Sequence, residues 1–137
     1  MFLTALACAA VVTSLNTVRA AAIPQTARGW TLGEDADTKK NPLVVNEKTL
    51  ADGRALYKAK CARCHGPAGL GDGPDADPEL TDMNLTEPKR AGRNPDGVVF
   101  YKVLNGRGRP KMPAFKDELS EEQIWAVVAY VQTLRKK

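Results

Sequence analysis

The sequence predicts a small, nearly all-helical (all-α) domain, and three observations point to this fold class. Its C-terminal segment repeats apolar residues at helical spacing, and other segments carry helix start or stop signals. We find no convincing strand pattern of alternating apolar and polar residues. The connecting segments are rich in Gly, Pro and Asp, as loops are.

Residues 1–22 are predicted to be a cleaved export signal. The run from Phe2 to Leu15 is apolar and uncharged, and small residues follow it, so that cleavage after Ala20 or Ala22 fits signal peptidase. A retained anchor is the alternative, although the run is short for a bilayer span. Cys8 is interpreted as a small hydrophobic residue of this signal.

The remaining length suits one small domain, 47–137, preceded by an extended arm, 23–46. Trp30 is the one aromatic residue of the arm, and it packs on the domain or faces a partner protein. The arm shows no clear periodicity and is interrupted by Pro24, Gly29, Gly33 and Pro42.

The first predicted helix runs from about Lys48 to Lys60. Gly53 lowers its helix propensity, which makes sense if another helix crosses at that point and the two backbones approach closely. Tyr57, one turn later, would flank the crossing. Residues 66–86 are then expected to form a long loop, rich in Gly, Pro and Asp.

A second helix is predicted between Asn94 and Gly106. Asn94 is expected to cap it, Pro95 suits the first helical position, and the charge of Asp96 complements the helix dipole. Gly106 fits the stop position.

The last helix has the clearest pattern. Ser120 and Gln123 match a capping box. Its apolar face repeats at helical spacing through Ile124, Val127, Val128, Val131 and Leu134.

The pentapeptide Cys61-Ala62-Arg63-Cys64-His65 indicates the chemistry of the protein. A Cys-x-x-Cys-His run is typical of covalent attachment of one c-type haem, with each thiol adding to a vinyl group and the histidine binding the iron. A disulfide, a redox dithiol and a zinc site are the alternatives. Zinc needs further Cys or His ligands, and the mature chain has none. The outer nitrogen of His65 is expected to bond to a loop carbonyl, for which we expect Pro74.

The second iron ligand follows by elimination. His65 is the only histidine, which excludes a bis-histidine haem within one chain and leaves Met, Lys, Tyr, water or no ligand on the other side of the iron. Loss of Met1 with the signal leaves Met83 and Met112 as thioethers. Met112 is favoured because prolines restrict the loop around it and enough chain separates it from His65 to reach the other haem face. A neutral sulfur ligand raises the reduction potential.

Charge is distributed unevenly along the chain, whose formal net charge is +4. Residues 72–87 hold six acids and no base, whereas residues 89–116 hold eight bases and one acid. Ordinary solvated surface and a docking face for an acidic redox partner are both open interpretations. Arg107 or Arg109 could also pair with a haem propionate. Nucleic-acid binding is not expected, because no binding motif is present.

Together these motifs resemble the small class I cytochrome c family from about Thr49 to Lys136. The resemblance rests on Gly53, Tyr57, the Cys61-x-x-Cys64-His65 motif, Gly66, Met112-Pro113, Trp125 and Tyr130. It implies a helical domain wrapped around one covalent haem c, with Tyr57 and Tyr130 at the crossing of the first and last helices. It also implies a haem edge partly exposed for electron exchange. Leu80 to Pro88 matches no subfamily closely.

The expected function is that of a periplasmic electron carrier, not an enzyme, whose haem iron cycles between ferric and ferrous states. Cys61, Cys64, His65 and Met112 bind the cofactor, and His65 and Met112 bind the iron. Redox proteins are the expected partners, with membrane contact only through a partner or an uncleaved N-terminal segment. An electron-transfer subunit fixed in a periplasmic dehydrogenase or reductase is the alternative. A haem catalyst or gas sensor is disfavoured because Met112 would block the iron.

Overall fold

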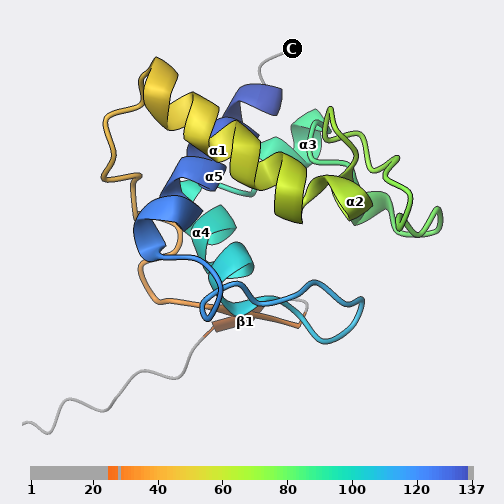
Figure 1. The fold of residues 1–137 in the computed structure, drawn as a ribbon. Helices are drawn as coiled ribbons and strands as arrows, with labels where there is room; N and C mark the ends of the chain where they lie inside the picture. Colours follow the sequence, from red (N-terminus) through yellow and green to blue (C-terminus); the bar gives the residue numbers. More distant parts are fainter. Residues whose placement is uncertain (1–24, 28, 136–137) are drawn as a thin grey trace, which may run out of the picture.

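The computed structural model describes residues 25–27 and 29–135. The predicted signal at 1–22 lies outside them. The described elements are β1 (Gln25–Ala27), β2 (Trp30–Leu32), α1 (Glu47–Lys60), α2 (Ala62–His65), the short 3-10 helix η1 (Thr81–Met83), α3 (Pro88–Ala91), α4 (Asp96–Asn105) and α5 (Glu121–Leu134). The helical class is confirmed (Figure 1).

The centre of the fold is the crossing of α1 and α5, which Figure 1 shows in yellow and blue. A Cβ atom placed on Gly53 would lie 2.0 Å from the carbonyl oxygen of Ala126, so only glycine permits this approach. One turn further, the rings of Tyr57 and Tyr130 lie 5.2 Å apart, centroid to centroid. The predicted crossing is therefore confirmed.

Helix α4 packs against α5 and completes the core. Phe100 of α4 stacks on Trp125 of α5, with ring centroids 4.2 Å apart. The predicted apolar face of α5 is buried, and Ile124 and Val128 have no exposed surface. The capping box of Ser120 and Gln123 is also present. The periodic pattern therefore identified the inner face correctly.

The start of α4 differs from the prediction, because Pro95 and not Asn94 is its N-cap residue. Asn94 lies one position too early, and its side chain donates to the carbonyl of Arg90 and accepts from Lys102. Gly106 ends the helix as predicted, with a positive φ of 61°.

The arm contains strands, contrary to the expectation that no strand occurs. β1 and β2 pair antiparallel, and the backbone of Trp30 forms an isolated bridge with Arg107, which in turn bridges Met112. Gly29 has a φ of 81°, which favours glycine at the tight connection. The prediction was wrong because each strand has only three residues and the second one pairs with a distant segment.

The arm continues along α4 as an integral part of the fold. Leu32 and Ala36 form a small core with Val98 of α4. The hydroxyl of Tyr101 donates to the Asp35 carboxylate at 2.7 Å. Within residues 25–27 and 29–135, no helix is long and apolar enough to cross a membrane.

Candidate haem site

The two motif cysteines lie where α1 ends and α2 begins. Cys61 is the C-cap of α1, and its carbonyl oxygen accepts the backbone N–H groups of Cys64 and His65 at 3.2 and 3.0 Å. These bonds coil the pentapeptide into one turn. Both thiols are free, and both line the same cavity as His65. The disulfide alternative therefore has no counterpart in the structure.

The imidazole of His65 is held by the loop that follows it. Its Nδ1 atom lies 2.8 Å from the carbonyl oxygen of Met83. Burial lowers the pKa of His65, while this bond and the charge of Asp82 oppose the shift. A neutral ring with its proton on Nδ1 leaves the lone pair of Nε2 available to a metal.

The carbonyl expected at Pro74 is not the one that His65 uses. The loop before Pro74 packs on α2 instead, since a Cβ atom on Gly73 would lie 2.2 Å from the carbonyl oxygen of Arg63. The 3-10 turn at Thr81–Met83 brings the Met83 carbonyl to the ring. The predicted bond between His65 and a loop carbonyl is therefore present, but the carbonyl belongs to Met83 and the prediction of Pro74 was wrong.

Met112 lies in a tight hairpin that follows α4. The backbone N–H groups of Arg107 and Met112 each donate to the carbonyl of the other, at 2.8 and 2.9 Å. The guanidinium Nε of Arg107 also donates to the carbonyl of Pro110. Met112 is half-buried and lines the cavity.

Met83, the other candidate thioether, also lines the cavity, but it lies beside His65. Its backbone carbonyl accepts from His65, and its sulfur lies 3.3 Å from the backbone nitrogen of Asp77. Its sulfur therefore already has a hydrogen-bond donor.

All four predicted site residues, Cys61, Cys64, His65 and Met112, line one cavity of about 490 Å³. This volume falls within the range of cofactor pockets. Much of the wall is apolar and consists of Leu80, Leu85, Val99, Val103, Phe115, Val127 and Val131. Two thiols, an imidazole nitrogen and a thioether facing an apolar space are the donor set that haem c requires, so the residues fit this cofactor.

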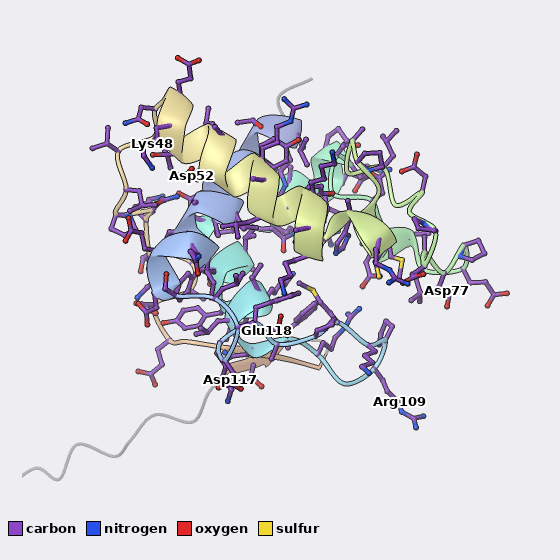
Figure 2. The ribbon with its side chains drawn as sticks, in the orientation of Figure 1. Lys48, Asp52, Asp77, Arg109, Asp117 and Glu118 are labelled. Carbon is purple, nitrogen blue, oxygen red and sulfur yellow. The ribbon has the colours of Figure 1, made fainter. Side chains whose placement is uncertain are left out.

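The basic residues of the loop after α4 include both buried and exposed side chains. Only 8% of the Arg107 side chain is exposed; it donates to Asp82 at 2.7 Å and lies 4.3 Å from the centre of the Trp30 ring. Arg107 therefore does not belong to an open docking face. Arg109 is exposed and projects away from the body of the protein (Figure 2).

Sequence reasoning missed several polar residues of the cavity wall, among them Asp82, Lys102 and Arg135. Lys102 carried a signal that could have been used. It is the one basic residue of α4 and follows Val98 and Val99 at helical spacing, so that it lies on an otherwise apolar face.

Comparison with known proteins identifies the family. The family described as "Cytochrome C oxidase, cbb3-type, subunit III" matches residues 48–131. Cytochrome c6 of Synechococcus sp. is 38% identical over 86 residues, covering 60% of this chain and 67% of its own. Cytochrome c6 of Chlorolobion braunii is 36% identical, covering 62% of this chain and 90% of its own.

A solved structure supports the same assignment. A chain of the reducing HAO-like protein complex of Kuenenia stuttgartiensis superposes with a TM-score of 0.60 at 33% identity, covering 68% of this chain. The match spans 46% of that chain, which is therefore much longer than the shared domain. The family match covers more than half of this protein, and the protein belongs to the class I c-type cytochromes, which carry electrons with a covalently bound haem c.

Proposed function

We propose that this protein is an exported carrier of single electrons with one haem c. Cys61 and Cys64 form the two thioether bonds, and His65 Nε2 and Met112 Sδ are the iron ligands. The observation that carries this proposal is that these four side chains line the same cavity although Met112 is remote in sequence.

The chain's own groups hold each ligand in place. The Met83 carbonyl fixes the orientation of the His65 ring. The Arg107–Met112 hairpin restricts the thioether, and the apolar wall excludes water. When bound, the haem iron supplies one-electron chemistry by changing between its ferric and ferrous states.

A carrier of this kind needs no substrate position at the iron. If His65 and Met112 both bind the iron, they would leave no position on it for a small molecule, which disfavours a catalytic or gas-sensing role. Partner recognition then takes place at the surface. Exposed Arg109, Lys111 and Lys116 lie in the segment around Met112 and favour a partner with an acidic docking surface.

A fixed haem subunit is the second candidate function. The similarity to a chain of a Kuenenia complex and to a family named for an oxidase subunit favours it. Against it, Trp30 packs on Arg107 of its own domain and so does not require a partner. Purification of the exported protein distinguishes the two: a monomer supports the carrier, and a fixed stoichiometry with another protein supports the subunit.

The direct test is expression with export and haem maturation. The pyridine haemochrome spectrum and the intact mass should report one haem with two saturated vinyl groups, in a protein that lacks its first 20 to 22 residues. Periplasmic material that is colourless, or that lacks the added mass, would refute the proposal. Substitution of Cys61 or Cys64 by Ser should leave one thioether bond, whereas Cys8→Ser should change nothing in the mature protein.

A further inference from the structure

The wall of the cavity holds a lysine for which the described residues provide no carboxylate partner. Lys102 of α4 is half-buried and donates to the amide oxygen of Asn94. Among residues 25–27 and 29–135, none of the ion pairs includes Lys102. Partial burial of an ammonium group without a counter-charge is unfavourable, so an anion bound beside Lys102 would be stabilised.

The surroundings of Lys102 are themselves positively charged. The groups whose charges act on it are Arg107, Arg135, Asp82 and Arg90. The one acid, Asp82, already pairs with Arg107. Burial is the main cause that lowers the pKa of Lys102 to about 8, and the three guanidinium groups lower it further. This part of the cavity therefore has an excess of positive charge.

The same place is bordered by Trp30 of β2. The Nζ atom of Lys102 lies 5.0 Å from the centre of the Trp30 ring, and the guanidinium carbon of Arg107 lies 4.3 Å from it. Both distances are within reach of a cation–π interaction. The backbone bridge between Trp30 and Arg107 ties this ring to the hairpin that carries Met112.

This positive region and the attachment region come from different elements of the cavity wall. Lys102 lies on α4, Trp30 on β2 and Arg107 in the hairpin after α4, whereas Cys61 and Cys64 lie where α1 ends and α2 begins. Haem carries its vinyl groups and its two carboxylates on opposite edges of the ring. Attachment at the cysteines therefore directs the carboxylates away from them.

We propose, on the basis of the haem attachment proposed above, that Lys102 binds a haem propionate, with Trp30 closing the site beside it. Lys102 is then a positioning residue for the cofactor. Trp30 of β2 then becomes part of the haem pocket.

The test uses the mature holoprotein and compares three variants: Lys102→Met, Lys102→Arg and Lys58→Met. Lys58→Met is the control, since it removes the same charge from an exposed position outside the cavity wall. Loss of an adjacent ammonium should raise the pKa of a carboxylate by about 1–3 units. In Lys102→Met, the pH range in which the reduction potential falls should therefore move upward by that amount. Within that range, the slope of the reduction potential is at most about 59 mV per tenfold change in proton concentration. Lys102→Arg and Lys58→Met should follow the wild type.

A second readout reports the carboxylate directly. Infrared difference spectra of reduced and oxidised protein, with isotope label at the propionate carboxyl carbons, should show a shifted carboxylate band in both Lys102 variants and in Trp30→Ala. The band should be unchanged in Lys58→Met. Because Lys102→Arg keeps the charge, it provides this readout even if Lys102→Met does not mature.

Two outcomes separate this inference from the proposed function. If wild type and variants carry one covalent haem but share the same titration and the same band, the Lys102 site is wrong and the carrier function stands. If the wild-type protein carries no haem, the proposed function fails and the inference fails with it.

Discussion

The Nδ1 atom of His65 lies 2.8 Å from the backbone carbonyl oxygen of Met83, one of the two methionines within residues 29–135. Met83 thus contributes to the site through its backbone, on the side of the imidazole. This contact fixes which nitrogen of His65 carries its proton. It also leaves Met112 as the thioether proposed to bind the iron.

Replacement of Met112 is expected to open the iron. In Met112→Ala the reduced protein should bind carbon monoxide rapidly at neutral pH, and the reduction potential should fall because the neutral sulfur ligand is lost. Absorption spectra and redox titration measure both effects. Met83→Leu is the control, since it keeps the backbone carbonyl, and it should retain the wild-type spectrum. The ligand assignment is wrong if the effects of the two substitutions are reversed.

The helix crossing is expected to tolerate no side chain at Gly53. Gly53→Ala places a Cβ atom 2.0 Å from the Ala126 carbonyl oxygen, so the holoprotein should lose about 1–3 kcal/mol or more of its free energy of unfolding. Gly92→Ala is the matched control, because no atom lies within 4 Å of its added Cβ. Denaturant unfolding should show an effect below about 0.5 kcal/mol for the control. Equal losses for the two variants would contradict the importance of the close approach.

Arg107 is expected to stabilise the hairpin that carries Met112. Arg107→Met removes the hydrogen bonds to Pro110 and Asp82 and leaves that carboxylate unpaired, at an expected cost of about 1–3 kcal/mol in denaturant unfolding. Arg109→Met makes the same change at the exposed end of the loop and should alter stability by less than about 0.5 kcal/mol. A neutral result for Arg107→Met would show that the buried pair is dispensable.

The packing of the arm, residues 30–39, on α4 is expected to weaken at low pH because of Asp35. Its hydrogen bonds with Lys39 and then with Tyr101 lower its pKa below the ordinary value of 3.8. The stabilisation that ionised Asp35 provides is therefore fully present above its unfolded-state pKa. It is lost as the pH falls through the lowered folded-state pKa. Hydrogen exchange of residues 30–39 should accelerate in this acidic range and, at neutral pH, in Asp35→Asn. Asp37→Asn, at an exposed neighbouring position, should leave the exchange of the arm unchanged.

Electron transfer to an acidic partner is expected to depend on salt. Arg109→Glu and Lys116→Glu should each slow the second-order rate with an acidic redox protein at low ionic strength, and the difference should shrink as salt is added. Lys58→Glu reverses the same charge on an exposed position of α1 outside the cavity wall and serves as the control. Equal slowing by all three would indicate a general effect of net charge and no local docking face.

The sequence by itself determined the attachment motif and the three long helices. Each of these depends on residues within a turn or two of one another, as in Cys61 to His65 or in the capping box of Ser120 and Gln123. The crossing of α1 and α5 joins distant residues, and its prediction needed the resemblance to a known family as well as Gly53. The inner face of α5 also followed from its own periodicity, since burial selects one side of a helix.

Only the tertiary structure decided which distant groups meet at the cavity. The pairing of Trp30 with Arg107, the choice of Met83 and not Pro74 beside His65, and the burial of Arg107 against Asp82 all join segments separated by loops. Local pattern does not encode such contacts, because they depend on how the loops close around the core, and a three-residue strand gains its partner only when the chain has folded.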